Sequence, residues 1–533
     1  MRKLLVAALV VCMGLSTGTA SAERSGGTLN FMAPYGGDLF GLDPHKSTRY
    51  QDLLVAMNIH RSLYKWDAEK NEAVPELAES VRVSDDGLVY TFTLRPDIKF
   101  HHGRQLTSDD VIYSYNRIAT MQPASPQLPK IIPIQGVQAV VDGKADRIAG
   151  LKKIDDLNFE MTLADPVDIK FYLWLPGTDI LPGDEIERLG DAFSTNPVGC
   201  GPFKFVRWVK GSEIILEKFA DFYIQDRPFL DKVVYKIMSE AAPRDLAFKA
   251  RELDANIVGS VNYPEYQADP VISQNLIEVA EMFTRVVGFN PDFKPFSDKR
   301  VRQAINYAIP SDLIIDKILK GKAFPARGYL PTTSPAFNPE IERYDFNIEK
   351  AKQLMKEAGY EDGFVVERAI GTANESWGTV IYEAAMPYLR QIGVTIKIEQ
   401  MEGAAMAERI RSGEYQMFIW SLTSGPDPLE ALARWKSVNP QAAGNHVKYN
   451  NPEFDRYLDL AAATRDNAEK IALIQKAEAI FVEDAPLWFF NYNKAILAHH
   501  PWVHNLAAVA PEMMFQDLTH VWVDETSPRA TVK

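Results

Sequence analysis

The 533-residue chain contains only two cysteines, Cys12 and Cys200, and this scarcity limits how its fold can be stabilised. Cys12 lies in an apolar segment near the N-terminus that we expect to be removed, which leaves no pair of cysteines for an internal disulfide. Stability must then come from the burial of apolar side chains. Because single hydrophobic cores stop growing at about 250 to 300 residues, a chain of this length predicts two or more lobes.

The first 22 residues have the three parts of a cleavable signal peptide. Arg2 and Lys3 supply the positive charge, residues 4–15 are apolar, and residues 20–22 form the small-x-small cleavage site Ala-Ser-Ala. The apolar stretch is shorter than the ~20 residues that cross a bilayer as a helix, and no later stretch reaches that length without charges. We therefore expect an exported, soluble product that begins at Glu23.

Cys12 does not indicate a lipid anchor. Residues 9–11, Leu-Val-Val, lack the small residue that a lipoprotein cleavage site places just before its cysteine. The exported product is therefore not expected to be lipid-anchored.

The composition describes an acidic globular protein. The formal net charge of −13 becomes −15 when Arg2 and Lys3 are removed with the signal peptide. A surface this acidic argues against nucleic acid or anionic lipid as the partner. With 46% apolar and 24% charged residues, the chain has the balance of an ordinary folded globule.

Local patterns predict a hairpin followed by a helix. Residues 81–83 and 90–94 alternate apolar and polar side chains on either side of Asp85-Asp86-Gly87, which is typical of two half-buried strands joined by a turn. Thr107 and Asp110 then form a capping-box pattern ahead of apolar residues at helical spacing.

Two more helices and three loops complete the organisation that the sequence predicts. We expect Ser297 to cap a helix that ends before Pro310, and a further helix over residues 348–358 that ends at Gly359. Clusters of proline and glycine predict loops over residues 122–135, 328–339 and 421–428. Strand and helix signals alternate irregularly, which favours mixed α/β lobes over a repeat array or a bundle.

Four stretches carry a more specific pattern, and they span nearly the whole chain after the signal peptide. They are residues 83–111, with Val-Ser-Asp-Asp-Gly at the start and Asp-Asp-Val at the end; residues 196–217, which begin Asn-Pro-Val-Gly-Cys-Gly-Pro-Phe; residues 289–360, with Phe-Ser-Asp-Lys-Arg-Val-Arg at 296–302; and residues 449–486, which begin Tyr-Asn-Asn-Pro-Glu-Phe-Asp. In order and spacing these blocks resemble the extracytoplasmic solute-binding proteins of family 5, the dipeptide, oligopeptide and nickel class.

The resemblance implies an α/β, two-lobed periplasmic-binding-protein fold of type II, in its large cluster C form, with mixed sheets and a hinge of two crossings. The N-terminal lobe, with an extra subdomain, would comprise residues 23–287 and 490–533, and the C-terminal lobe residues 288–489. The two crossings are expected near residues 287–290 and 489–492. A ligand would lie in the cleft between the lobes and stabilise their closed form.

The function that the resemblance implies is that of a periplasmic substrate-binding component of an ABC importer. Such a monomer would capture a peptide or peptide-like small molecule and deliver it unaltered to the inner-membrane permease with its ATPase, without cofactor, metal or catalysis. Two alternatives stay open. One is a periplasmic peptide-binding chaperone or signalling receptor, and the other is an importer receptor for opine-like or oligosaccharide ligands.

One position departs from the peptide-binding members of the family, in which a carboxylate three residues after a tryptophan pairs with the free amino terminus of the ligand. Here Trp420 is kept but the acid is replaced by Thr423. A desolvated ammonium without a charged partner is costly, so a free peptide amine is not expected unless Asp427 or another acid reaches it. The expected ligand-binding residues are Arg49, Tyr50, Trp420, Thr423, Ser424, Asp427, Asn491 and Tyr492.

Other chemistry is set aside. Packing is expected for Trp435, Trp488 and His446, although some metal-chelate binders use the loop that holds His446. The Gly-Leu-Ser-Thr-Gly of residues 14–18 fits a nucleophile motif, but it lies in the signal peptide. Cys200 is expected to be a buried structural residue and not a catalytic thiol.

Overall fold

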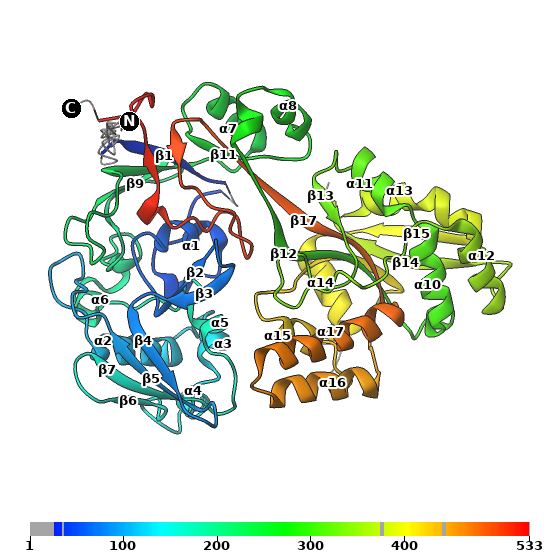
Figure 1. Cartoon of the computed structure of the whole chain (residues 1–533), viewed down its shortest axis with the longest axis horizontal. Coiled ribbons are helices and arrows are strands. Elements are labelled where there is room, and N and C mark those ends of the chain that lie inside the picture. The colour runs from blue at the N-terminus through cyan, green and yellow to red at the C-terminus, as the bar shows by residue number, and fades with distance from the viewer. Residues whose placement is uncertain (1–25, 35–36, 374–377, 440–443, 532–533) are drawn as a thin grey trace, which may run out of the picture.

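The computed structural model describes residues 26–34, 37–373, 378–439 and 444–531. The expected signal peptide, with Cys12 and the nucleophile-like motif, lies outside these residues. The chain forms two lobes that lie side by side, and two long strands run between them (Figure 1). Mixed sheets covered by helices make up both lobes, as the sequence predicts.

The N-terminal lobe is built on two four-stranded sheets. The first has the order β1-β10-β9-β8, in which only the β1–β10 pair is parallel. The second, β4-β5-β7-β6, lies at the bottom of this lobe in the view of Figure 1. The strands are β1 (Thr28–Ala33), β4 (Ala78–Val83), β5 (Val89–Leu94), β6 (Leu151–Lys153), β7 (Asn158–Thr162), β8 (Phe203–Val209), β9 (Glu213–Lys218) and β10 (Lys232–Ile237).

Smaller elements complete this lobe. The hairpin of β2 (Tyr64–Asp67) and β3 (Glu72–Pro75) and the pair β18 (Val503–His504) and β19 (Trp522–Val523) lie outside its two main sheets. Its helices are α1 (Tyr50–Ala56), α2 (Ser108–Thr120), α3 (Leu128–Ile131), α4 (Val137–Val141), α5 (Lys170–Leu173), α6 (Gly183–Leu189), α7 (Ala241–Lys249) and α8 (Tyr263–Ala268).

A seven-stranded sheet connects the lobes. Its order is β11-β17-β12-β16-β14-β15, with β13 paired to β17. The two longest members, β12 and β17, pair in antiparallel register from Leu276 opposite Ala498 to Gly288 opposite Leu487. The strands are β11 (Ala255–Ile257), β12 (Leu276–Phe289), β13 (Ala323–Pro325), β14 (Phe364–Gly371), β15 (Val394–Gln400), β16 (Met417–Thr423) and β17 (Leu487–His499).

Helices flank this sheet in the C-terminal lobe. Helices α11 and α13 lie above the sheet in the view of Figure 1, α10 and α12 lie toward the end of the lobe far from the first lobe, and α15 to α17 lie below the sheet. They are α9 (Lys294–Ser297), α10 (Lys299–Ala308), α11 (Ser311–Lys317), α12 (Ile348–Glu357), α13 (Thr379–Leu389), α14 (Gly403–Ser412), α15 (Pro428–Ala433), α16 (Pro452–Ala463) and α17 (Asn467–Glu483).

Three hydrophobic cores follow the division into lobes. One core serves the N-terminal lobe and reaches Met282 on β12 and Ala495 on β17. The other two lie on opposite faces of the connecting sheet and take Val286 and Tyr492 on one face and Val287 and Phe490 on the other. Core membership therefore changes within a few residues of both predicted crossings, although the predicted lobe boundaries themselves stay a prediction.

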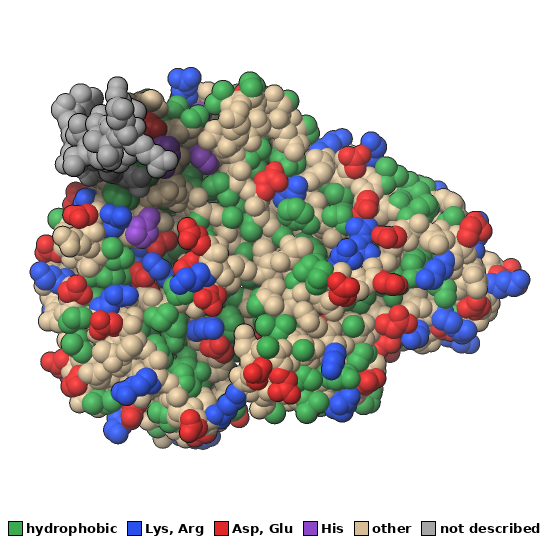
Figure 2. Space-filling view, in the orientation of Figure 1, with side chains coloured by type: hydrophobic (Ala, Val, Ile, Leu, Met, Phe, Trp, Pro, Cys, Tyr) green, Lys and Arg blue, Asp and Glu red, His purple; other side chains and the backbone are tan. Residues whose placement is uncertain are grey.

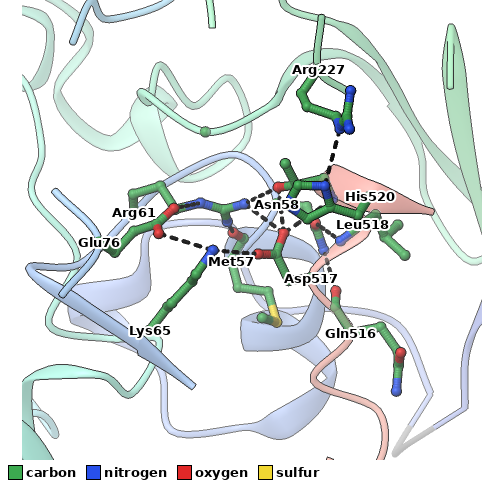
Figure 3. A network of polar contacts seen from close by, with 12 residues as sticks. Met57, Asn58, Arg61, Lys65, Glu76, Arg227, Gln516, Asp517, Leu518 and His520 are labelled. Carbon is green, nitrogen blue, oxygen red and sulfur yellow. Dashed lines mark hydrogen bonds and ion pairs between the residues drawn. The ribbon is translucent and has the colours of Figure 1, made fainter. Parts of the chain in front are cut away.

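A buried ion network fixes the returning C-terminal segment to the N-terminal lobe (Figure 3). Asp517 lies 2.7 Å from the Arg61 guanidinium and 3.7 Å from the Lys65 ammonium, while Glu76 pairs with both cations from their other side. Although burial acts to raise it, these two cations hold the pKa of Asp517 well below its ordinary value. The network compensates every charge it buries, which is the condition for tolerating such a group in a core.

Most local predictions are confirmed. Val81 pairs with Phe92 in the predicted hairpin, α2 begins at the predicted capping box, and Gly359 adopts the left-handed conformation after α12 with φ 79°. Residues 328–339 form neither helix nor strand. Trp435, Trp488 and Cys200 are buried, as expected.

Three local predictions are wrong. Residues 128–131, within the loop expected over residues 122–135, form the short helix α3. Asp298, and not Ser297, caps α10, because its carboxylate accepts a hydrogen bond from the Arg300 backbone N–H at 2.9 Å. Ser297 instead donates to the Lys294 carbonyl oxygen and closes the preceding turn. The loop expected to begin at residue 421 begins after Thr423, because β16 stays paired with β12 up to that residue.

Candidate functional site

The floor of the candidate site is the three-strand ribbon β16-β12-β17. Arg285 on β12 lies opposite Ser421 on one side and Asn491 on the other, and Thr423 lies opposite Phe283. Side chains of directly opposed residues point to the same face of a sheet, and so do those two residues apart along a strand. Two predicted site residues, Thr423 and Asn491, therefore share one face with Arg285.

Unsatisfied polar atoms lie in this part of the fold. The Asn491 Nδ2, Ser421 Oγ and Ser424 Oγ atoms are buried and have no hydrogen-bond partner among the described residues. Ser424 follows Thr423 in the turn after β16, and its backbone N–H donates to the Met282 carbonyl oxygen at 2.8 Å. Buried polar groups are normally paired, so these atoms are available to a ligand or to water.

Trp420 and Tyr492 lie on the opposite face. Trp420 is opposite Val286 and three residues before Thr423, and an odd spacing along a strand puts two side chains on opposite faces. Its half-buried ring lines a cavity of about 370 Å³ with Phe418 and His446. Tyr492 is buried, and its hydroxyl oxygen accepts hydrogen bonds from the backbone N–H groups of residues 327 and 328. The structure thus separates these two aromatic residues from the Thr423 face.

Asp427 is the N-cap of α15, and its carboxylate accepts hydrogen bonds from the backbone N–H groups of Leu429 and Glu430. Burial raises its pKa above the ordinary value, and the Asp168 charge of the N-terminal lobe acts in the same direction. The carboxylate therefore faces the other lobe, but helix capping already occupies one of its oxygens.

Arg49 and Tyr50 begin α1 in the N-terminal lobe. The Arg49 guanidinium donates to the Asp38 carbonyl oxygen at 3.2 Å and lies 3.8 Å from the centre of the Phe40 ring. Tyr50 keeps 40% of its surface exposed. Burial of the rest, with the Glu512 and Glu281 charges, raises the pKa of Tyr50 to about 12.

Glu281 occupies an irregularity in the β12–β17 ladder. Pairing shifts between Ala280 and Thr284, so that residues 281–283 of β12 face Asn493 alone. The Glu281 carboxylate accepts hydrogen bonds from the Met513 backbone N–H at 2.9 Å and from the Asn493 side-chain amide. Burial raises the pKa of Glu281, which weakens its negative charge.

A cavity of about 600 Å³ beside this irregularity is lined by both lobes. Ala241, Ala242 and residues 256–257 and 259–262 line it from the N-terminal lobe. Leu319, Lys322 and Ala373 line it from the C-terminal lobe, with Asn493 of β17 between them. A second cavity of about 490 Å³ shares Ser260, Val261 and Ala373 with it and extends toward α13. The first of these two neighbouring cavities, lined by Lys322, is here called the interlobe cavity.

The sequence analysis did not identify Lys322, Arg285 and Glu281 as site residues. Lys322 stands in the short connection between α11 and β13 and is placed by β13, whose Ala323 pairs with Asn493. That pairing joins segments about 170 positions apart, and the local sequence around Lys322 carries no signal for it. Arg285 and Glu281 could be recognised only as charged residues inside an otherwise apolar strand.

The N-terminal lobe contains another cavity, of about 780 Å³, lined by Trp66, Trp174 and part of the ion network of Figure 3. None of the predicted site residues lines it. Its walls come from one lobe only, so a ligand there would not contact both halves of the molecule.

The described residues offer little to a metal or to a nucleophilic mechanism. No group of three or more His, Cys, Asp or Glu side chains within them is placed to hold a metal ion. Burial raises the pKa of the Cys200 thiol well above its ordinary value, which disfavours the reactive thiolate. None of the helices described is long and apolar enough to span a bilayer.

Two lobes joined by paired strands, with a cavity lined by both, define the periplasmic-binding-protein class of fold. The profile of the family described as "Bacterial extracellular solute-binding proteins, family 5 Middle" matches residues 72–443. The chain belongs to this family.

One curated protein and two solved structures are similar to the chain. The sequence is 29% identical over 453 residues to heme-binding protein A of Haemophilus influenzae, covering 81% of each chain. The fold matches the murein tripeptide-binding protein MppA in its unliganded open form with a TM-score of 0.82, at 22% identity over 94% of this chain and 98% of that one. It matches the ABC transporter-associated periplasmic binding protein DppA of Helicobacter pylori, in complex with the peptide STSA, with a TM-score of 0.73, at 26% identity over 94% and 99% of the two chains.

Proposed function

We propose that the chain is the substrate-binding component of an ABC importer and captures a peptide or peptide-like small molecule between its lobes. The observation that supports this most directly is the interlobe cavity, lined by both lobes beside the strands that join them, in a member of a solute-binding family. A ligand that contacts both lobes favours the state in which they approach, because it binds that state more tightly. Binding of a ligand then changes the shape of the protein, and a permease can recognise that shape.

The proposed function also specifies the cellular location, the oligomeric state and the membrane partner of the protein. It acts as a monomer in the periplasm after cleavage of residues 1–22, without a lipid anchor, and delivers its ligand chemically unchanged to an inner-membrane permease with its ATPase. The periplasmic, ABC transporter-associated description of the DppA relative supports this setting. Figure 2 shows acidic and basic side chains interspersed over one face of both lobes, which suits a freely diffusing protein better than one bound to a polyanion.

The ligand is proposed to contact the face of the sheet that carries Thr423 and Asn491. Thr423 is exposed at the end of β16, and its hydroxyl accepts a hydrogen bond from the Gly425 backbone N–H at 3.1 Å. Tyr50, partly exposed at the start of α1, is proposed to contact the ligand from the N-terminal lobe. The relatives are named for heme and for peptides, so membership of the family does not fix the ligand.

The lobe boundaries are part of the same proposal. Residues 23–287 and 490–533 would move as one body and residues 288–489 as the other, with bending near residues 287–290 and 489–492. The irregular pairing at residues 281–283 lies close to the first of these positions.

Native mass spectrometry of protein purified without unfolding tests the proposal. We expect one ligand per chain, recovered with its original mass after release, and a decrease in the radius of gyration by small-angle scattering when that ligand is added back. Consumption of the ligand, or identical scattering with and without it, would contradict the proposed function.

A further inference from the structure

Lys322 is a cation without a partner inside the interlobe cavity. Its side chain is half-buried, and its ammonium makes no hydrogen bond or ion pair with any residue that the structure describes. Burial lowers the pKa of Lys322 to about 8, and the neighbouring carboxylates only partly oppose this effect. A lysine held in this way destabilises the unliganded fold, because its desolvation is not compensated.

The charges around Lys322 do not balance. Glu281, Arg285, Lys494 and Glu278 act on it electrostatically, so the group holds three cations and two carboxylates. Glu278 pairs with Lys494 at 3.5 Å, and the Glu281 carboxylate is bound by Met513 and Asn493. Burial raises the pKa of Glu281 and lowers that of Arg285 to about 10, so that surplus positive charge is left at the site. This surplus lies within a chain whose net charge is −13.

The opposite wall of the cavity carries a second feature of the same sign. Helix α7 begins at Ala241, which lines the cavity with Ala242, and its N-cap residue Glu240 makes no side-chain capping hydrogen bond. The first backbone N–H groups of a helix have no partner within the helix and favour a negative charge. Lys322 of one lobe and the start of α7 of the other therefore line the same space.

We propose that the interlobe cavity binds an anionic group of the ligand, a carboxylate in a peptide-like molecule, between Lys322 and the N-terminus of α7. This inference rests on the proposed function and specifies its ligand class: an acidic compound that presents no free ammonium to the Thr423 face. The bound anion neutralises the surplus charge and contacts both lobes at once. Binding of the anion and approach of the lobes are therefore one event.

The cavity does not suit a free peptide amine. An ammonium placed there would face Lys322, which lines the cavity, and neither Thr423 nor Asn491 carries a compensating charge. Among the acids, Glu281 and Glu278 already have hydrogen-bond or ion-pair partners. Like charges in a partly desolvated site repel, whereas a charge-assisted hydrogen bond to a carboxylate is among the stronger polar contacts in proteins.

Three matched compounds test the proposal on the full chain. N-acetyl-alanylalanine carries only the carboxylate, alanylalanine amide only the ammonium, and alanylalanine both. We expect the acetylated compound at millimolar concentration to raise the melting temperature most and the amide to leave it unchanged. A response to the amide alone, or no response to any of the three, overturns the proposal.

Two variants assign the effect to Lys322. Lys322→Met keeps the length of the side chain and removes its charge, so the affinity for N-acetyl-alanylalanine should fall roughly tenfold to a hundredfold. Lys317→Met is the control, because Lys317 is exposed on α11 five positions away, lines neither cavity and should change the affinity less than about threefold. Equal affinity in wild type and Lys322→Met contradicts the proposal.

The stability of Lys322→Met without ligand tests the proposal independently of any added compound. Lys322→Met should be at least as stable to urea as the wild type, because it removes an uncompensated cation. A strong loss of stability would mean that Lys322 has a structural partner, and the proposal would fall. A copurified ligand without any anionic group would also overturn this inference while leaving the proposed function intact.

Discussion

Glu478 of α17 makes the stability of the protein dependent on pH. Its side chain is 1% exposed, one carboxylate oxygen accepts the Leu330 backbone N–H at 2.7 Å, and the other has no hydrogen-bond partner among the described residues. Burial raises the pKa of Glu478 to about 8 from an ordinary value of 4.5. The folded chain therefore retains a proton that the unfolded chain has already released.

The sign of the effect follows from proton linkage. A carboxyl group whose pKa is raised by folding contributes its full stability below the unfolded value, and that contribution is lost as the pH rises to the folded value. For values of 4.5 and about 8, the free energy of unfolding should fall by about 3.5 kcal/mol between pH 5 and pH 8 from this group alone.

Glu478→Gln isolates this contribution. The amide keeps the volume and the oxygen that accepts from Leu330, but it cannot ionise. Urea unfolding of both proteins from pH 5 to pH 8 should show the variant gaining about 3.5 kcal/mol on the wild type over that range. Glu483→Gln, at the exposed end of the same helix, is the control and should remain within about 0.5 kcal/mol of the wild type.

Two outcomes would refute this reasoning. If the stability curves of wild type and Glu478→Gln run parallel from pH 5 to pH 8, the carboxyl group is not protonated in the fold at neutral pH. If Glu483→Gln shows the same pH-dependent gain, the effect does not arise from burial at residue 478.

Three further changes test other parts of the structure. Asp517→Asn removes the 2.7 Å ion pair with Arg61 and should lower the free energy of unfolding by about 3 kcal/mol in urea titrations, and a loss below about 1 kcal/mol would contradict the role given to the network. Gly288→Ala would place a methyl group 2.1 Å from the Phe418 ring and should cost about 1 to 3 kcal/mol by the same measurement, with partial recovery when Phe418→Leu is added. Trp420→Ala should leave the ligand affinity unchanged in calorimetry, because its ring lies on the sheet face opposite Thr423, and a loss of about 1 to 3 kcal/mol would show instead that the ring contacts the ligand.

The fold was predictable where the controlling interactions are local. The hairpin around Gly87 and the capping box at Thr107 depend on residues within a few positions of each other, and the structure contains both. The N-cap of α10 was misplaced by one residue, because Ser297 and Asp298 are both suitable cap residues and the pattern does not choose between them.

The candidate site was less predictable, because pairing between distant segments assembles it. The sequence shows that Trp420 stands three residues before Thr423. It does not show that both residues belong to a strand, β16, and that their side chains therefore point to opposite faces of the sheet. Lys322 reaches the interlobe cavity only because β13 pairs with β17. Neither sequence motifs nor the periodicity of apolar residues could therefore identify the positive charge of Lys322, on which the expected ligand class depends.

The pairing of β12 with β17 restricts how the two halves of the molecule can rotate. Both covalent links belong to a single hydrogen-bonded ribbon, so neither can bend while the other stays straight. In the proposed closure both links deform together, and each half acts as a lever arm. A small torsion at the ribbon produces a large displacement at the outer rim, where a membrane partner could sense it without contacting the ligand.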